Sequence, residues 1–517
     1  MSIYMIIASL FHKRVTSISA INFSLLILLI INPYSILDIG MQLSYGGTIG
    51  IIFLNKPLKK VVNKKLKKKE QDSSTNLIRK LKEKIMEIVL ISLSANIIIL
   101  PITLYHFNTL SITFLISNLL ASPLLGAIII LGFLTIIISF IFEPIAKILT
   151  IPLKILIEVL LQVATRVGNI PFSQVYLKTP KIYLICAYYL AIAMYILYKK
   201  LKNKNNKRRI EKIIFKKVKK INQKKIVAFV LIITILFSIY NHIPQNLKIN
   251  FIDVGQGDST LVITPNNKTI LIDGGGNKTG YDIGKNVLLP YLLNKGITKL
   301  DYIIVSHFDT DHVGGLLSLM ENLKVGQVII SKQGEDSENY QKFNKIIKDK
   351  KIKGKVVTKG DKIQIEKNIY FDILWPDNSK LIGENILNNN SIVCKLCYKS
   401  FSMLFTGDIE EIAEREILKQ YKDNINILNS TILKVGHHGS KTSSIQSFVE
   451  AVKPKIALIG VGKNNKFGHP NDAVIERLKK CGTKIYRTDQ MGEIMLNINT
   501  KGKIKVKKFI EQERLIN

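Results

Sequence analysis

The residues of this chain that could do chemistry gather in its second half. Five of the eight histidines lie there, each in a polar turn with glycine nearby. The densest turn is "SHFDTDHVGG", residues 306–315, where two histidines and two aspartates fall within six positions. Imidazole and carboxylate groups are the kind that bind divalent metal ions. Together with the later turns "TGD" and "GHHGS", this stretch predicts a metal site.

The spacing H-x-D-x-D-H suits two metal ions. A loop that leaves a strand can aim His307 and Asp309 at one metal while Asp311 and His312 serve a second. Asp408, at another strand end, and a distal histidine would complete a pair held about 3.5–4 Å apart. Such a pair activates water and neutralises the charge that develops during phosphodiester hydrolysis. We therefore expect a metal-dependent hydrolase.

These turns need a scaffold, and the residues after 245 show the pattern of one. Short strand-like segments bounded by Gly, Pro, Asn or Asp alternate with helical stretches at 341–349, 410–419 and 471–480. Strands that run into polar residues at their C-terminal ends predict sheets flanked by helices. Residues 246–517 are therefore assigned to a hydrolase domain. Residues 1–245 carry repeated apolar runs near spanning length and are assigned to a membrane domain.

The membrane domain is expected to have about seven spans and a cytoplasmic N-terminus. Spans are predicted at about 15–33, 41–55, 85–105, 182–198 and 226–241, with an in-and-out pair between 110 and 142 that breaks at "ASP". Lysine runs between the spans carry much of the net charge of +36 and are interpreted as cytoplasmic loops, with a nucleic-acid patch as the alternative. Residues 145–167 fit an amphipathic helix on the outer face, with a plain span as the alternative. This topology places the hydrolase domain outside the cytoplasmic membrane.

The motifs "FIDVGQGDS", "LIDGGG", "SHFDTDHVGG", "LFTGD", "KVGHHGSKTS" and "FGHP", in this order, resemble the metallo-β-lactamase-type domain of the ComEC family of DNA-uptake channels. The stretch "NPYSILDIGMQLSYGGTIGII" resembles that family's competence region. The resemblance implies a four-layer αβ/βα fold with nuclease activity, joined to a channel that passes single-stranded DNA while the other strand is degraded outside. It also implies DNA-receptor and helicase partners, and it leaves a homodimer open.

The resemblance also implies roles for individual residues. Its metal ligands in this sequence are His307, Asp309, Asp311, His312, Asp408 and His437. Asp273 is the aspartate of the first motif, and Asp408 is the bridging carboxylate. Asp311, Asp408 and His437 are expected to be the catalytic residues. The adjacent His438 is the competing assignment for His437.

Several further residues are expected beside the metals. Lys434 and Lys441 flank "GHHGS" and, with Ser440 and Thr442, either hold phosphate oxygens or are ordinary surface residues. Asp258 and Ser259 in "GQGDS" are either turn formers or substrate contacts. His469 in "FGHP" is expected to contact substrate more than metal.

The sequence departs from the wider superfamily in its ligands and from the family in its length. Asp309 stands where a histidine is common, and "NNNSIV", residues 388–393, offers only Asn and Ser where a further histidine is common. Carboxylate ligands favour Mn²⁺ or Mg²⁺ over Zn²⁺. The chain begins inside the competence-like region, so its spans are expected to form an incomplete channel. Either a separate polypeptide supplies the missing part, or the chain is a truncated form.

Two other functions are compatible with the sequence. One is a membrane-tethered phosphodiesterase that acts on cell-envelope polymers, although such an enzyme would not need a competence-like membrane half. The other is a transport component whose second domain is catalytically idle and only gates or docks. The complete set of Asp and His residues argues against an idle domain.

Overall fold

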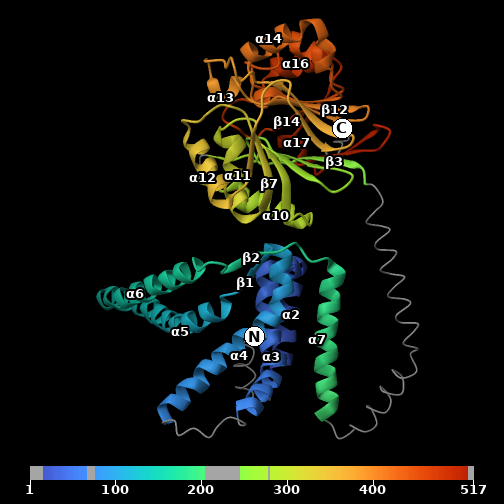
Figure 1. Cartoon of the computed structure of the whole chain (residues 1–517). Helices are drawn as coiled ribbons and strands as arrows, with labels where there is room; N and C mark the ends of the chain where they lie inside the picture. The colour runs from blue at the N-terminus through green and yellow to red at the C-terminus, as the bar shows by residue number, and fades with distance from the viewer. Residues whose placement is uncertain (1–15, 67–75, 204–244, 278–279, 511–517) are drawn as a thin grey trace, which may run out of the picture. The chain divides into compact units, whose positions relative to one another are not determined.

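The computed structural model describes residues 16–66, 76–203, 245–277 and 280–510 of the chain (Figure 1). The chain divides into two compact units, residues 1–220 and 221–517. The first described strand of the second unit begins at Leu247, next to the domain boundary predicted between residues 245 and 246.

The first unit consists mainly of long helices. Its elements are α2 (Ser17–Ile31), η1 (Pro33–Leu37), α3 (Ile39–Leu66), α4 (Asn76–Phe107), β1 (Thr109–Ser111), α5 (Phe114–Ser139), α6 (Glu143–Gly168), β2 (Gln174–Tyr176) and α7 (Ile182–Asn203). The short strands β1 and β2 pair antiparallel and tie the start of α5 to the segment after α6. Long apolar helices are the expected form for a membrane region, because each satisfies its own backbone hydrogen bonds.

The contact between α3 and α4 depends on small residues. A Cβ at Gly50 would overlap the carbonyl oxygen of Ser94, and a Cβ at Gly47 would lie 3.1 Å from the side chain of Ile99. Glycine allows two helix backbones to approach where lipid provides no hydrophobic drive between helices. The stretch "YGGTIG" in α3 therefore specifies this contact.

Three of the described helices are long and apolar enough to cross a membrane: Ile78–Phe107, Phe114–Ser139 and Glu143–Gly168. Two shorter apolar helices, Ser17–Ile31 and Ile182–Leu197, coincide with spans predicted from the sequence. The span predicted at 41–55 lies in α3, which does not meet the same criterion over its described residues. The span predicted at 226–241 and residues 1–15 lie outside the described residues.

The predicted break at "ASP", residues 121–123, is wrong. Residues 114–139 form one helix, α5, that continues through Pro123. A proline removes one helical hydrogen bond, but every other backbone group of an apolar segment still needs its helical partner. The Ser122 hydroxyl also donates to the Asn118 carbonyl at 2.5 Å across this turn. The predicted in-and-out pair is therefore a single helix.

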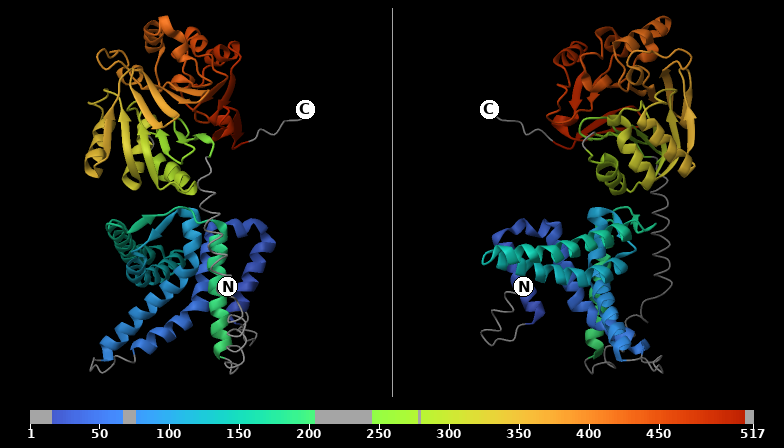
Figure 2. Two further views of the ribbon diagram at one scale, coloured as in Figure 1. Left: turned by 45° about the vertical axis from the view of Figure 1, so that its right-hand side comes forward. Right: turned by 90° about the vertical axis from the view of Figure 1, so that its left-hand side faces the viewer.

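Residues 145–167 form most of α6, which lies beside α5 in both views (Figures 1 and 2). Its charged residues pair one turn apart, Lys147 with Glu143 at 2.8 Å and Lys154 with Glu158 at 3.8 Å. The helix is predicted correctly, and its apolar length also satisfies the criterion for a span. Its place on the outer face stays a prediction.

The second unit contains two sheets. The eight-stranded sheet has the order β17-β16-β3-β4-β5-β6-β7-β8, with β3 (Leu247–Phe251), β4 (Thr260–Ile263), β5 (Thr269–Ile272), β6 (Lys299–Ile304), β7 (Lys324–Ile330), β8 (Lys353–Val356), β16 (Ile494–Ile498) and β17 (Ile504–Lys508). The seven-stranded sheet has the order β15-β14-β13-β12-β11-β10-β9, with β9 (Lys362–Glu366), β10 (Ile369–Trp375), β11 (Val393–Tyr398), β12 (Phe401–Phe405), β13 (Ile432–Lys434), β14 (Ile456–Ile459) and β15 (Lys484–Arg487). In each sheet a run of parallel strands adjoins antiparallel ones, β5 to β8 in the first and β12 to β15 in the second.

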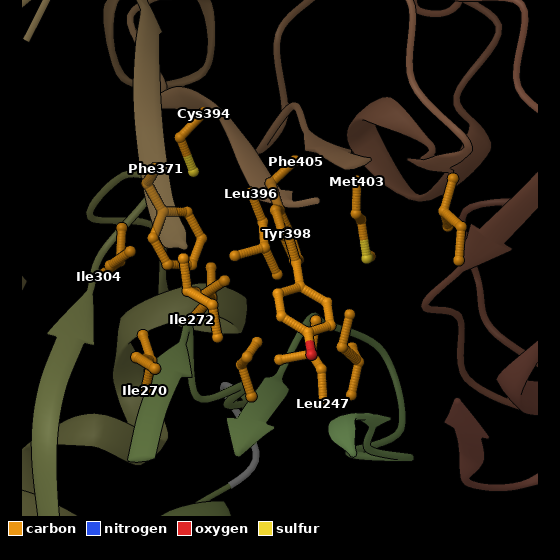
Figure 3. Close-up of a cluster of buried hydrophobic side chains, with 14 of the residues drawn as sticks. Leu247, Ile270, Ile272, Ile304, Phe371, Cys394, Leu396, Tyr398, Met403 and Phe405 are labelled. Carbon is orange, nitrogen blue, oxygen red and sulfur yellow. The ribbon is translucent and has the colours of Figure 1, made fainter. Parts of the chain in front are cut away.

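The two sheets pack face to face around a buried apolar core (Figure 3). Alternate residues of each strand point inward, so β12 contributes Met403 and Phe405 while Leu404 between them faces the other way. Phe371 of β10 joins them, and Ile270 and Ile272 come from the facing sheet. Each such side chain contributes about 1.5–3 kcal/mol by its burial.

Helices cover the outer faces of both sheets. Near the eight-stranded sheet lie η2 (Gly284–Leu288), α10 (Leu289–Asn294), α11 (Thr310–Asn322) and α12 (Glu338–Lys350) (Figure 1). On the seven-stranded sheet, α14 (Glu411–Gln420), α15 (Gln446–Val452) and α16 (Asp472–Lys480) bury apolar side chains against outward-facing strand residues such as Leu404. The shorter elements are α13 (Ile386–Asn389), η3 (Lys422–Leu428), η4 (Gly436–Gly439) and α17 (Thr488–Met491). The predicted four-layer αβ/βα sandwich is confirmed, and α12, α14 and α16 match the helices predicted from the sequence.

Candidate metal centre

The candidate site lies where several strands of the two sheets end. His307 follows β6, Asp408 follows β12, and His438 follows β13. Because the carboxyl ends of neighbouring parallel strands meet at one edge of a sheet, residues far apart in the sequence come together here. The two sheets present these edges to each other, so each supplies part of the site.

Three buried side chains converge on one point. His312 Nε2 lies 3.1 Å from Asp408 Oδ2, His438 Nε2 lies 3.3 Å from the same oxygen, and the two Nε2 atoms are 3.3 Å apart. Asp258 joins them in a group whose ligand atoms all lie within 4.8 Å of one another. Asp311, on the open side of the group, places Oδ2 3.3 Å from His438 Nε2.

The backbone of the second motif explains how it presents its side chains. Asp309 is the N-cap residue of α11, so Asp311 and His312 fall in its first turn. Asp273, directly after β5, accepts a hydrogen bond from the Ser306 amide at 2.8 Å and one from His312 Nδ1 at 2.9 Å. The His312 ring is therefore fixed with Nε2 toward the group. Asp273, the aspartate of the first motif, therefore orients His312 and is not itself a member of the close group.

The structure separates the two adjacent histidines of "GHHGS". Both have positive φ, 48° for His437 and 54° for His438, in the turn η4. His438 is buried in the group, and its Nδ1 donates to the Gly460 carbonyl at 2.8 Å, which leaves Nε2 facing Asp408. The His437 ring lies outside the group, with Nδ1 3.4 Å from Glu410 Oε1. The competing assignment, His438, thus takes the place expected for His437.

Lys434 lies beneath the site. Its side chain is only 3% exposed, and its ammonium donates to the Gly407 carbonyl at 2.7 Å and to Asp408 Oδ1 at 3.2 Å. It also forms a close ion pair with Asp258. Burial opposes the charge, but the carboxylates of Asp258 and Asp408 outweigh it and raise the pKa of Lys434. The expected phosphate contact is therefore not available to Lys434, because two carboxylates occupy its ammonium.

His307 and Asp309 form a second pair of ligand atoms beside the group. His307 is fully buried, and its Nε2 has no hydrogen-bond partner among the residues that the structure describes but lies 3.6 Å from Asp309 Oδ2. The His307 and His312 ring centroids are 4.1 Å apart. An orphaned buried imidazole nitrogen that faces a carboxylate fits the first metal position predicted for these two residues.

The segment that lacks the superfamily's further histidine has a structural role. Ser391 Oγ accepts from the Asp408 amide at 3.2 Å, and Asn389 Oδ1 accepts from the Glu410 amide at 3.1 Å. The Asn390 amide donates to two carbonyls at 2.8 Å. Ser391 and Asn389 therefore hold the turn that carries Asp408, while Asn390 fastens the segment 382–386.

The charges of the site fit a divalent cation. Burial opposes protonation of His438, but Asp408, Asp258 and Asp311 raise its pKa to about 10. Burial likewise opposes ionisation of Asp408, but His312, His438 and Lys434 hold its pKa well below the usual range. Buried carboxylates and imidazole nitrogens that face one another need either protons or a metal ion between them. The donor set of nitrogen and oxygen atoms is suited to a divalent metal.

The remaining predicted contacts lie around this group. Ser440 and Thr442 are linked to each other at 3.0 Å, and Thr442 donates to Glu410 Oε1 at 3.0 Å. The His469 ring centroid lies 5.7 Å from that of His437. Burial, followed by the charges of His438 and His437, lowers the pKa of His469 to about 4. His469 is therefore neutral and lies at the edge of the site, outside the close group.

Sequence reasoning missed the part that Asp258 and Lys434 play together. The sequence offers Asp258 as a turn former or substrate contact and Lys434 as a phosphate contact or surface residue. No local spacing connects them, because they are 176 positions apart. Lys434 is the last residue of a fully buried strand, "ILK". A lysine in a strand with that burial requires a buried carboxylate, and this is the one signal that could have indicated the pair.

Residues 252–463 match the family model of the metallo-beta-lactamase superfamily. With the four-layer fold and the buried Asp and His group, this match defines the second unit as a domain of that superfamily, whose fold supports metal-dependent hydrolysis. Residues 1–202 match the family model described as competence protein. The chain therefore has a region that matches the competence proteins followed by a metallo-β-lactamase superfamily domain, and the resemblance to the ComEC family is confirmed.

The chain is similar to several known proteins over part or most of its length. The chain is 27% identical over 500 residues to ComE operon protein 3 of Bacillus subtilis (strain 168), covering 94% of this chain and 59% of that protein. It is 30% identical over 277 residues to competence protein ComA of Neisseria gonorrhoeae, covering 53% and 36%. Among solved structures, the metallo hydrolase Igni18 of Ignicoccus hospitalis aligns with a TM-score of 0.33 at 12% identity, covering 51% of this chain and 100% of that one. The chain thus spans 59% and 36% of the lengths of these two curated relatives.

Proposed function

We propose that the chain is a DNA-uptake component of natural transformation and that its second unit hydrolyses DNA phosphodiester bonds. The observation that carries the proposal is the convergence of His312, His438 and Asp408 at one buried point, in a chain that also has a competence-family region. The second unit acts on the outer side of the membrane, where it degrades the strand that is not transported. The three apolar helices and the lysine-rich loops between predicted spans support a multi-pass membrane protein.

Two divalent ions are proposed for the site, with Mn²⁺ or Mg²⁺ preferred to Zn²⁺ because of its carboxylates. Asp311, His312, Asp408 and His438 would hold one, and His307, Asp309 and Asp408 the other. When bound, such a pair polarises a phosphate group and lowers the pKa of water that attacks it. Asp309 is 44% exposed at its side chain and Asp311 35%, so substrate approaches from their side.

The chain's own residues orient these ligands from behind. Asp273 accepts from His312 Nδ1, and the Gly460 carbonyl accepts from His438 Nδ1, so both rings turn Nε2 toward the centre. Lys434 holds Oδ1 of Asp408, which leaves Oδ2 for the centre. Outer partners of this kind fix ring orientation and ligand basicity. The site is therefore preorganised for a cation before any substrate arrives.

Nuclease activity of the purified full-length chain tests the proposal. The chain, in detergent micelles with Mn²⁺, Mg²⁺ or Zn²⁺, is expected to cleave single- or double-stranded DNA, and Asp311→Ala is expected to abolish the cleavage. Asp349→Asn, on the exposed face of α12, is the matched control and should retain it. A folded, metal-loaded chain that cleaves no DNA would refute the nuclease. Cleavage of an envelope polymer instead would favour the tethered phosphodiesterase, and absence of both would favour a domain that only gates or docks.

A further inference from the structure

An exposed aromatic residue lies at the edge of the candidate metal centre. Phe467, in the loop 462–468 after β14, is 68% exposed. Its ring centroid lies 5.8 Å from that of His469, whose ring lies 5.7 Å from that of His437, the neighbour of His438. A short chain of rings therefore leads from the buried group to the surface. The reaction proposed above has no use for this exposed ring.

Hydrogen bonds hold the loop that presents Phe467 in one shape. The Asn465 amide donates to the carbonyls of Gly462 at 3.1 Å and His469 at 2.7 Å. Its carbonyl oxygen accepts from the amides of Phe467 at 3.2 Å and His469 at 3.0 Å. One side chain thus cross-links the loop at four points. A fixed exposed ring loses little entropy when a flat ligand stacks on it.

The loop and the residues that follow it are also fastened to the two turns that build the site. The Gly462 amide donates to Gln256 Oε1 at 3.2 Å, in "GQGD", and the Asn471 amide donates to the Gly439 carbonyl at 2.8 Å, in "GHHG". A Cβ at Gly462 would lie 2.8 Å from the Gln256 backbone nitrogen, so the loop packs directly on that turn. The position of Phe467 is therefore set relative to Asp258 and His438.

The charge of the loop is complementary to a nucleic-acid strand. Lys463 and Lys466 flank Asn464 and Asn465, and both lysines are exposed. A groove that binds single strands combines cations for the phosphates with aromatic rings on which bases stack. An apolar partner surface would be expected to meet an uncharged loop.

We propose that the loop 462–468 is a nucleobase subsite beside the metal centre. Phe467 stacks on an unpaired base of a single-stranded nucleic acid, and Lys463 and Lys466 contact its phosphates. The subsite rests on the proposed function in one respect, since it places the neighbouring phosphate of the same strand at the metal centre. It makes single strands with exposed bases the preferred substrate class.

Binding, measured without cleavage, tests the subsite. The full-length chain in detergent with EDTA is titrated with a fluorescent twelve-residue oligothymidylate and with an abasic strand of equal length and charge. Phe467→Leu is expected to weaken binding of the oligothymidylate by about 5- to 150-fold, the range that stacking of one base confers, and to leave binding of the abasic strand unaffected. Phe509→Leu, 76% exposed at the end of β17, is the matched control and should change neither.

A second measurement locates the base. A strand carrying 5-iodouracil is irradiated on the chain, and the cross-linked peptide is identified by mass spectrometry. Cross-linking to Phe467, retained in Phe509→Leu and lost in Phe467→Leu, is the expected result. Equal oligothymidylate affinity of wild type and Phe467→Leu, with cross-links elsewhere, overturns the subsite even if the chain is a nuclease. Selective loss of base binding in a chain that cleaves no DNA would uphold the subsite and refute only the nuclease.

Discussion

Replacing Lys434 by methionine is expected to destabilise the second unit more than any other single lysine change near the site. The ammonium is buried and donates to Gly407 and Asp408, and it pairs with Asp258. Methionine fills a similar volume but leaves two carboxylates in the interior without their cation. The attraction across the 3.2 Å between Lys434 and Asp408 is on the order of 5 kcal/mol at an effective dielectric of about 20.

Desolvation of the charges offsets part of that attraction, and removing one partner of a buried ion pair costs about 3–5 kcal/mol. We therefore expect Lys434→Met to lower the free energy of unfolding of the metal-free protein by about 3–5 kcal/mol. A divalent ion supplies positive charge at the same carboxylate, so metal should restore part of the stability. For the same reason Lys434→Met should bind the metal more tightly than wild type.

The assay uses the only tryptophan of the chain, Trp375, which is buried at the end of β10. Its fluorescence reports unfolding of the second unit in the full-length protein, in denaturant, with EDTA or with Mn²⁺. Lys441→Met, at an exposed lysine of the neighbouring turn, is the control and should stay within about 0.5 kcal/mol of wild type. If Lys434→Met lowers the free energy of unfolding in EDTA by less than about 1 kcal/mol, or binds the metal more weakly than wild type, the role given to Lys434 is refuted.

Three further substitutions test other parts of the second unit. Burial raises the pKa of Glu414 to about 7, so the folded state keeps the Glu414 proton at pH values where the unfolded state has lost it. The stability that this proton contributes is lost as pH rises through about 7. The advantage of wild type over Glu414→Gln in free energy of unfolding should therefore shrink by up to about 3 kcal/mol between pH 4.5 and pH 8 in the fluorescence assay, and a pH-independent difference would contradict this. Asp273→Asn removes the carboxylate that orients His312 and should lower metal affinity about 10- to 100-fold in calorimetric titration, whereas unchanged affinity would show that the orientation does not depend on Asp273. Gly257→Ala should lower the free energy of unfolding by at least about 2 kcal/mol, because φ at Gly257 is 136° and a Cβ there would overlap the Asp311 carbonyl oxygen. An unchanged free energy of unfolding would mean that this turn can relax.

The four layers could be predicted from the sequence because strand and helix periods are local signals. β11 shows alternate burial over its last five residues, and the helix 472–480 begins at the cap residue Asn471. The metal site was predictable in type because "SHFDTDHVGG" concentrates ligands in one turn. Which of His437 and His438 joins the buried group was not predictable, since it depends on two successive left-handed residues and on Gly460 from another strand end. The break expected at Pro123 failed because the apolar surroundings of a membrane helix outweigh a single missing donor.

The site depends on both sheets, and this has a consequence for folding. Asp258, Asp273 and His312 come from the connections of the eight-stranded sheet, whereas Asp408 and His438 come from those of the seven-stranded sheet. The carboxylates of Asp258, Asp273 and Asp408 would repel one another if the sheets met with no positive charge between them. Protons, the Lys434 ammonium or a metal ion can supply that charge. That ammonium links the two halves permanently, since its ion pairs join one carboxylate from each sheet. We therefore expect packing of the apolar core and assembly of this group to be one cooperative step, and a metal ion that binds the assembled group to stabilise the whole sandwich.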